Sequence, residues 1–226
     1  EVNYRRFFDI NDLAALRMEN HEVFAHTHRL VFELLREHKV DGLRIDHPDG
    51  LYDPAQYFAR LRGEYQRIAA DAKRTRSRRG ALYVIAEKIT APYERLPEHW
   101  PIAGTTGYDF LRLVNGLFVD RSRRGRLDRA WRTFTGEDRP WEDIALESRH
   151  LILRTSLAAE VTVLANQAHR IARADRRTRD FSLNALRQAI RDIIAHFPVY
   201  RTYIAGDISS EDERYLRWAV TRARAR

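Results

Sequence analysis

The residues most able to do chemistry gather at the end of one short apolar stretch, VDGLRIDHPDGL, at positions 40–51. Alternation along a strand would place Gly42, Arg44 and Asp46 on one face, with Arg44 beside Asp46 at the carboxyl end. A neighbouring guanidinium lowers the pKa of a carboxyl group and keeps it ionised. Because an ionised and positioned carboxylate can act as a nucleophile, the pattern makes Asp46 a candidate nucleophile.

A second carboxylate stands at the end of the next apolar stretch, ALYVIAEK, at positions 81–88. There Tyr83, Ile85 and Glu87 would share a face, and Glu87 would again lie at the carboxyl end. Consecutive parallel strands usually lie close together, so Asp46 and Glu87 are a candidate pair of nucleophile and general acid/base. Retaining glycosidases hold such a pair about 5–5.5 Å apart.

The same residues also have simpler interpretations. Charged residues after a strand often only form the next turn, and Asp49-Gly50 is a turn pair in its own right. A lone histidine near a strand end, such as His47, is usually a hydrogen-bonding residue. A metal site built from His47 and Asp49 has no evident third ligand, so the sequence predicts no metal and no cofactor.

Two helices and two strands are predicted to position these residues. The first helix spans about residues 20–38 with Asn20 as its cap, and a strand follows at 40–46. The second helix spans about residues 53–79 with Asp53 as its cap, and it precedes a strand at 81–86. Helices that alternate with strands are typical of parallel βα units, so the predicted fold class is α/β.

The rest of the chain has no further strand of this type, and its second half is helical in pattern. An extended segment is expected at 5–10, closed by residues 9–12. A loop is expected at 92–107 and a further element at 108–118. From about residue 127 the chain should be helical, with two of its helices capped by Ser182 and Ser209.

Composition excludes several function classes. The 226 residues contain no Cys, so neither a disulfide framework nor a cysteine-based metal site is expected. No apolar run approaches the roughly 18 residues of a membrane span, and no secretory signal pattern is present. The net charge is +8, with the densest basic cluster at residues 73–79. Because no nucleic-acid motif accompanies this cluster, a solvated surface is preferred over a polyanion-binding module.

Short sequence blocks carry a resemblance to a known family. GLRIDH at 42–47 and YVIAEKI at 83–89 resemble the strand-four and strand-five motifs of the α-amylase superfamily. More narrowly, the chain resembles the maltooligosyltrehalose synthases, a family of intramolecular glucosyl mutases. The blocks that carry this narrower resemblance are NYRRFFDINDLAALRME at 3–19, VDGLRIDHPDGLYDP at 40–54, VIAEKI at 84–89 and GTTGYDF at 104–110.

The resemblance implies a division of the chain. Residues 1–119 would form part of a (β/α)8 TIM barrel, about strands 4–6, and residues 120–208 a helical insertion. Residues 209–226 would form a terminal helix that returns toward the barrel. The third carboxylate of the family and its strand-three motif have no convincing copy here. The chain is therefore expected to be an internal fragment that is inactive on its own.

The resemblance also implies residue roles. Asp46 matches the nucleophile and Glu87 the general acid/base, while Arg44 matches the residue that orients and charges the nucleophile. Further substrate contacts are expected from His47, Lys88, Asp9 and Asn11.

The implied reaction is an intramolecular transglucosylation by a retaining double displacement. It converts the reducing-end α-1,4 link of a maltooligosaccharide into an α,α-1,1 link. The expectation is a monomeric, cytoplasmic isomerase with a maltooligosaccharide substrate and no nucleic-acid or membrane partner. An amylase-like hydrolase or transglucosidase is the alternative, followed by an inactive structural fragment or a polyanion-binding module.

Overall fold

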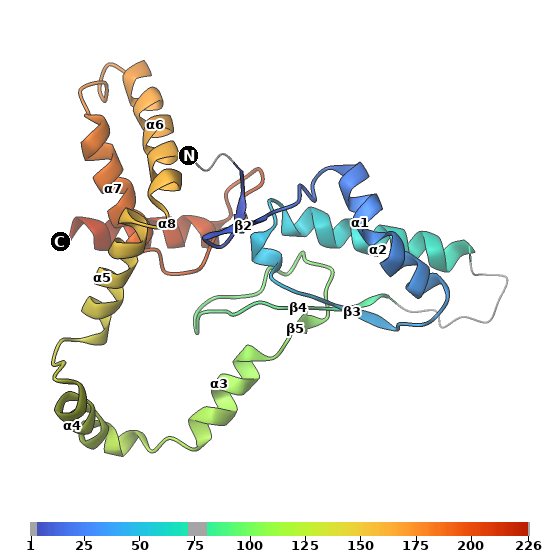
Figure 1. Ribbon diagram of the computed structural model, residues 1–226, viewed down its shortest axis with the longest axis horizontal. Helices are drawn as coiled ribbons and strands as arrows, with labels where there is room; N and C mark the ends of the chain where they lie inside the picture. Colours follow the sequence, from blue (N-terminus) through green and yellow to red (C-terminus); the bar gives the residue numbers. More distant parts are fainter. Residues whose placement is uncertain (1–3, 72–80, 226) are drawn as a thin grey trace. The chain divides into compact units, whose positions relative to one another are not determined.

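The computed structural model describes residues 4–71 and 81–225, which divide into two compact units (Figure 1). One unit spans residues 4–116 and the other continues from residue 117. Each is described by itself below. The basic cluster at residues 73–79 lies outside the described residues. None of the helices in the described ranges is long and apolar enough to cross a membrane.

The first unit contains a three-stranded parallel sheet with the order β3-β4-β5. These strands span Gly42–Ile45, Tyr83–Ala86 and Gly104–Thr105. The first two agree with the predicted strands, and their parallel pairing confirms the α/β class. The third was not predicted, because it lies inside the segment expected to be a loop. No apolar pattern marks this strand in the sequence. It is held by backbone hydrogen bonds, with the amides of Ala103 and Thr106 donating to the carbonyls of Val84 and Ala86.

Gly42 sets how closely the first two strands of this sheet approach. It is the register partner of Tyr83, and a Cβ atom added at Gly42 would lie 2.6 Å from the Tyr83 carbonyl oxygen. That oxygen belongs to the backbone, so it cannot move away as a flexible side chain would. Glycine is therefore required here for close approach of two strands.

Two helices, α1 (His21–Arg36) and α2 (Pro54–Asp71), lie on one side of the sheet (Figure 1). The predicted caps are confirmed. Asn20 Oδ1 accepts from the amides of Glu22 and Val23 at 2.8 and 3.3 Å, and Asp53 Oδ1 accepts from the Gln56 amide at 2.9 Å. Side-chain acceptors at these positions satisfy amides that the helix leaves without a partner.

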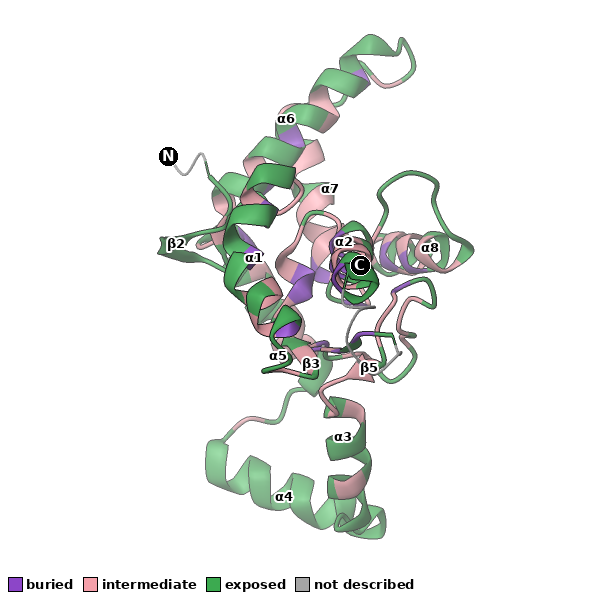
Figure 2. Cartoon of the chain, turned by 90° about the vertical axis from the view of Figure 1, so that its right-hand side faces the viewer, coloured by how far each residue is buried: buried purple, intermediate pink, exposed green. Residues whose placement is uncertain are grey.

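The core of this unit forms where α1, α2 and β4 meet, and Figure 2 marks its buried positions. Its members are mostly aromatic and aliphatic, and they include Phe24, Leu35, Tyr57, Phe58, Leu61, Val84 and Ala86. A buried polar pair lies among them. The Nδ1 atom of His28 is 2.9 Å from the Phe24 carbonyl, which can only accept, so Nδ1 carries the proton. Nε2 then accepts from the Tyr57 hydroxyl at 2.8 Å, and burial lowers the pKa of His28.

An antiparallel hairpin precedes α1 and is formed by β1 (Arg6–Phe7) and β2 (Ile10–Ala14). The prediction that residues 9–12 close the extended segment was wrong, because Ile10 begins a second strand. Phe8 has a φ of 54° and lies in the left-handed region at this reversal. The sequence offered no glycine there, which is the residue that usually marks such a turn.

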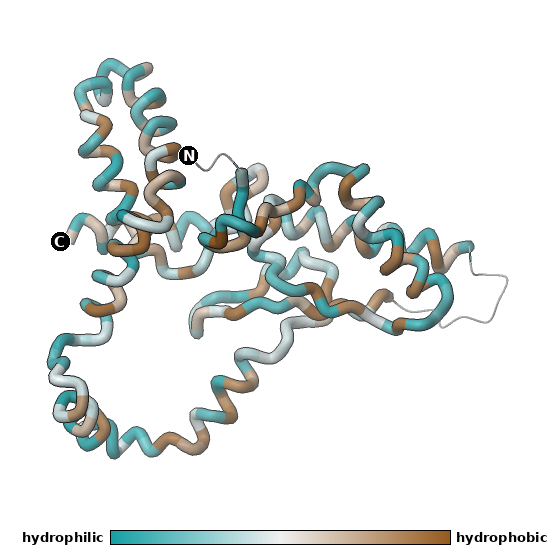
Figure 3. The backbone as a smooth tube through the Cα atoms, viewed as in Figure 1, coloured by the Kyte–Doolittle hydropathy of each residue, from teal (hydrophilic) through white to brown (hydrophobic). Residues whose placement is uncertain are grey.

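The second unit is helical throughout its described part, and teal and brown alternate along its helices in Figure 3, as in amphipathic segments. α3 (Tyr108–Leu117) ends at the boundary, and a short 3-10 turn (Arg121–Arg123) follows. The caps predicted at Ser182 and Ser209 are confirmed, since each hydroxyl accepts from an amide three residues on. The remaining helices are α4 (Arg124–Thr135), α5 (Trp141–Arg154), α6 (Ala158–Ala174), α7 (Leu183–Ala195) and α8 (Ser210–Arg224).

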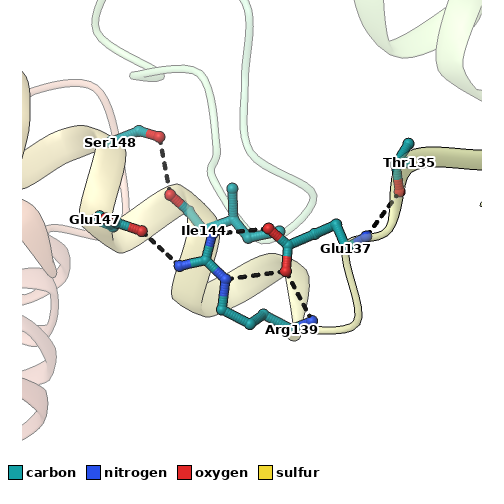
Figure 4. A network of polar contacts seen from close by, with 6 residues as sticks. All are labelled: Thr135, Glu137, Arg139, Ile144, Glu147 and Ser148. Carbon is teal, nitrogen blue, oxygen red and sulfur yellow. Dashed lines mark hydrogen bonds and ion pairs between the residues drawn. The ribbon is translucent and has the colours of Figure 1, made fainter. Parts of the chain in front are cut away.

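Helices α5, α6 and α7 share a small apolar core around Leu153, Val161 and Ala195. The loop between α4 and α5 is held by an exposed network, which we call the surface cluster: Arg139, Glu137 and Glu147 (Figure 4). Arg139 donates to both oxygens of Glu137 at 2.9 and 2.7 Å and to Glu147 at 2.7 Å. The hydrogen bonds from Arg139 lower the pKa of Glu137 to about 2.

Candidate active site

Asp46 and Glu87 lie at the carboxyl ends of adjacent parallel strands, one residue beyond β3 and β4. The ladder continues past the last paired residues, because the Glu87 amide donates to the Ile45 carbonyl at 2.8 Å. With Ile45 opposite Ala86, Asp46 and Glu87 come next on neighbouring strands. The structure therefore brings together the two carboxylates that strand alternation had singled out.

The carboxyl group of Glu87 is held by three neighbours. Its Oε2 accepts from the His47 backbone amide at 3.0 Å, and its Oε1 accepts from the Tyr108 hydroxyl at 3.3 Å. The Asp46 side chain is its third polar neighbour. The His47 amide is the largest reason why the pKa of Glu87 lies below its ordinary value, and Asp46, Tyr108 and the charge of Arg44 lower it further.

Arg44 faces Asp46 in an open ion pair. Its Nη2 lies 3.5 Å from Asp46 Oδ1, and the two side chains are 59% and 70% exposed. Solvent screens such a pair, so it contributes little to stability. It does keep a positive charge beside the carboxylate at the end of β3.

His47 has a backbone conformation that non-glycine residues rarely adopt, with φ 41° and ψ 53°. This left-handed geometry turns its amide toward Glu87 and starts the 3-10 turn η1 (Pro48–Gly50). Its ring contacts Phe7 and Phe8 of the hairpin, with centroids 5.2 and 4.6 Å away. Strained conformations of this kind cost about 1–3 kcal/mol and are concentrated at functional sites.

Asp9 and Asn11 lie on the same hairpin, where Arg6 engages both. Arg6 Nη1 donates to Asn11 Oδ1 at 2.8 Å and to the Asp9 carbonyl at 3.3 Å. These contacts stabilise the hairpin that carries Phe7 and Phe8. A contact of Asp9 or Asn11 with substrate stays a prediction.

Lys88 lies on the opposite side of β4 from Glu87, in the interior with Val84 and Ala86. Its Nζ lies 3.2 Å from Asp49 Oδ2 and 2.8 Å from Glu94 Oε1. We call Lys88, Asp49 and Glu94 the buried cluster, since their side chains are 0%, 9% and 5% exposed. This position does not support the predicted contact between Lys88 and a substrate, which stays a prediction.

Tyr108 is a site residue that reasoning from the sequence missed. It is the first residue of α3 and follows Gly107, whose φ of 99° directs the chain into the helix. The next residue, Asp109, accepts from the Thr90 hydroxyl at 2.7 Å, which fixes the start of α3 near the end of β4. Tyr108 belongs to the GTTGYDF block, so the resemblance marked the segment without indicating which side chain reaches the carboxylates.

No group of three or more His, Cys, Asp or Glu within residues 4–71 and 81–225 could hold a metal ion. The arrangement at the strand ends is a pair of interacting carboxylates with one guanidinium, one backbone amide and one phenol around it. Such a pair can attack an electrophilic carbon and move a proton.

No protein-family model matches the chain. Two curated proteins of Mycobacterium tuberculosis, from strains CDC 1551 / Oshkosh and ATCC 25618 / H37Rv, are provisionally described as maltooligosyl trehalose synthase. Each is 42% identical to this chain over 117 residues, which cover 52% of this chain and 14% of the relative. The solved maltooligosyltrehalose synthase of Arthrobacter ramosus is 33% identical over 99% of this chain, with a TM-score of 0.79.

The chain resembles one segment of the maltooligosyltrehalose synthases. A solved glycosyltrehalose synthase of strain DSM5389 agrees, with 32% identity over 95% of this chain and a TM-score of 0.74. The resemblance predicted from the short sequence blocks is thus confirmed. The chain spans 14% of the curated relatives and 26% of the length of the Arthrobacter synthase. The helical unit is included in the structural match, because that match covers nearly the whole chain.

Proposed function

We propose that this chain supplies the nucleophile and the general acid/base of an enzyme that acts on α-1,4-linked glucans. The observation that carries the proposal is the placement of Asp46 and Glu87 side by side at the ends of adjacent parallel strands. In a barrel of parallel strands this end carries the site. We further propose that β3, β4 and β5 are consecutive strands of such a barrel, with the helical unit inserted after them.

The proposed reaction is an isomerisation in two displacements. Glu87 gives a proton to the glycosidic oxygen of the reducing-end α-1,4 link, while Asp46 attacks the anomeric carbon and that carbon–oxygen bond breaks. Glu87, now a carboxylate, then removes the proton from the anomeric hydroxyl of the released glucose. That oxygen attacks the glycosyl–enzyme, Asp46 leaves, and an α,α-1,1 link forms with retention.

The neighbours of Glu87 suit the second of these steps. Donation from the His47 amide and the Tyr108 hydroxyl favours the ionised form, which is the form that acts as a base. The first step needs the proton on Glu87. A bound saccharide that excludes water would raise the pKa of Glu87 through desolvation. The exposed rings of Phe7 and Phe8 lie beside His47 and offer apolar faces to a sugar.

Hydrolysis or transglucosylation of an α-glucan is the second candidate, and it uses the same two carboxylates. The exposure of Arg44 and Asp46 favours it, because water reaches the pair freely in this chain. Mutase activity requires the released glucose to stay in place while water is kept out. The fate of the glucose therefore separates the two candidates.

The test uses the full-length protein that contains this chain, incubated with maltopentaose. A product with a non-reducing trehalosyl end indicates the mutase, and a gain in reducing ends indicates the hydrolase. Asp46→Asn and Glu87→Gln should each lower turnover by at least about 100-fold, whereas Glu98→Gln, which removes an exposed carboxylate elsewhere in the unit, should not. Normal turnover by Asp46→Asn would show that the nucleophile is wrongly assigned.

A further inference from the structure

We propose that the buried cluster is a positioning device for Glu87. Through Asp49 it holds the 3-10 turn η1, and with it the His47 amide, against the Glu87 carboxylate. Its consequence for catalysis rests on the function proposed above, while its consequence for the Glu87 carboxyl group does not.

The contacts form a closed ring around the end of β4. Glu87 and Lys88 are consecutive and point to opposite sides of the strand. Lys88 Nζ reaches Asp49 at 3.2 Å, Asp49 lies in η1 two residues after His47, and the His47 amide returns to Glu87 at 3.0 Å. A shift of η1 would therefore change the distance between the amide and the carboxylate directly.

The turn depends on an anchor of this kind. η1 has only three residues, begins from a left-handed His47, and lacks a side-chain cap at its start. Its backbone closes with the Gly50 amide on the His47 carbonyl and the Leu51 amide on the Pro48 carbonyl, each at 3.0 Å. Those bonds fix the shape of the turn. The ion pair between Asp49 and Lys88 joins the turn to the end of β4.

The two carboxylates of the buried cluster have separate tasks. Asp49 links Lys88 to η1, whereas Glu94 links Lys88 to the segment after β4. Glu94 Oε2 accepts from the Ala91 amide at 2.9 Å, and the Glu94 amide donates to the Ala91 carbonyl at 2.9 Å. Loss of Glu94 therefore removes a buried charge of the same sign without releasing η1, which makes it a matched control.

Burial of the ion pairs also favours a positioning role over a stabilising one. Desolvation of ionised groups offsets most of their mutual attraction, so a buried ion pair contributes little net stability over an apolar replacement. Its better-supported use is to fix one arrangement out of several. The groups that face Glu87 are Asp46, Arg44, Tyr108 and His47. The buried cluster acts on Glu87 through His47.

The test compares Asp49→Ala, Asp49→Asn and Glu94→Gln, with the titration of the Glu87 carboxyl carbon in this chain followed by NMR. In Asp49→Ala the titration midpoint should move upward toward the ordinary value of 4.5, because the hydrogen bond from the His47 amide is weakened. Asp49→Asn keeps an acceptor for Lys88 and should titrate like the parent. Glu94→Gln should lower stability without moving the midpoint.

An unchanged midpoint in folded Asp49→Ala, or an equal shift in Glu94→Gln, would overturn the proposal. If Asp49→Ala does not fold, Asp49→Glu keeps the charge and displaces η1 by one methylene. It should move both the midpoint and the His47 amide resonance, and a parent-like spectrum would again overturn the proposal.

In the full-length protein, the acid limb of the pH–kcat profile should move with the midpoint, and kcat of Asp49→Ala should fall up to about 100-fold. The NMR result does not depend on turnover, so a failure of the proposed function can be distinguished from a failure of this positioning role.

Discussion

Two clusters of this chain have the same arrangement of charges in opposite surroundings. The buried cluster and the surface cluster each hold one cation between two carboxylates. Their contacts are similar, at 2.8 and 3.2 Å around Lys88 and at 2.7 to 2.9 Å around Arg139. Lys88 is fully buried, whereas the Arg139 side chain is 50% exposed.

The difference between the clusters shows that contact geometry alone does not fix the energetic role of an ion pair. Around Arg139, water solvates each charge whether or not the partners meet, so breaking the contact costs little. Around Lys88, the charges have already lost their water, so each one depends on the others. The contacts near Glu87 should accordingly be rigid, and those between α4 and α5 easily exchanged.

The largest expected effect is for Lys88→Met, which removes the cation that the buried Asp49 and Glu94 share. The free energy of unfolding should fall by about 3–5 kcal/mol, as for other broken buried pairs. Urea unfolding measures it. The triple variant Lys88→Met, Asp49→Asn, Glu94→Gln should regain most of this loss, because it leaves no uncompensated charge. If the triple variant stays as unstable as Lys88→Met, packing and not charge is responsible.

The buried pair of Tyr57 and His28 carries no full charge, so it separates the effect of burial from that of charge. Tyr57→Phe removes the donor to His28 Nε2 and leaves that nitrogen buried without this partner. The loss should be about 1–3 kcal/mol, less than for Lys88→Met, since no full charge is exposed to the interior. Tyr83→Phe, at an exposed position of β4, should change stability by less than about 0.5 kcal/mol, as is usual for surface substitutions. Equal losses in the two variants would contradict this account.

The same pair predicts a dependence on pH. Burial lowers the pKa of His28 below 6.5, so the unfolded chain binds this proton more readily than the folded chain. The contribution is fully present above pH 6.5 and is lost as the pH falls toward the lower folded pKa, by up to about 1.4 kcal/mol per pH unit. Unfolding between pH 8 and pH 5 measures it, with His28→Gln as the variant that cannot titrate. A parallel fall in both proteins would assign the effect to other groups.

The smallest effect is expected in the surface cluster. Arg139→Ala should lower stability only slightly, and the difference should shrink in 1 M salt, which screens exposed charges. Lys88→Met should keep its effect at the same salt concentration. A salt-insensitive loss of several kcal/mol in Arg139→Ala would mean that the loop between α4 and α5 is far less solvated than its exposure indicates.

Local signals in the sequence predicted much of this fold. Asn20, Ser182 and Ser209 begin helices because a side-chain oxygen satisfies an amide nearby, and this is a property of the residue itself. Strand alternation likewise placed Asp46 and Glu87 on one edge. It could also have placed Lys88 in the interior, since Lys88 follows Val84 and Ala86 at the same spacing.

The missed features depend on contacts between segments distant in the sequence. The strand at Gly104–Thr105 has two residues and exists because β4 offers it backbone partners. Tyr108 reaches Glu87 across 21 positions of chain, and no periodic pattern encodes that approach. The hairpin turn at Phe8 uses a left-handed aromatic residue, which turn preferences disfavour.

Within residues 42–46, Gly42 is required for folding, whereas Arg44 and Asp46 are the residues proposed to serve catalysis. The hydrogen side chain of Gly42 is what lets the Tyr83 carbonyl come so near, so a randomised library sorted only for folded clones should return glycine there. The Arg44 and Asp46 side chains are largely exposed, so the same sort should accept many other residues at these two positions. Only a screen for turnover should recover them. Deep mutational data on this stretch would thus record two different selections on the same face of a single strand.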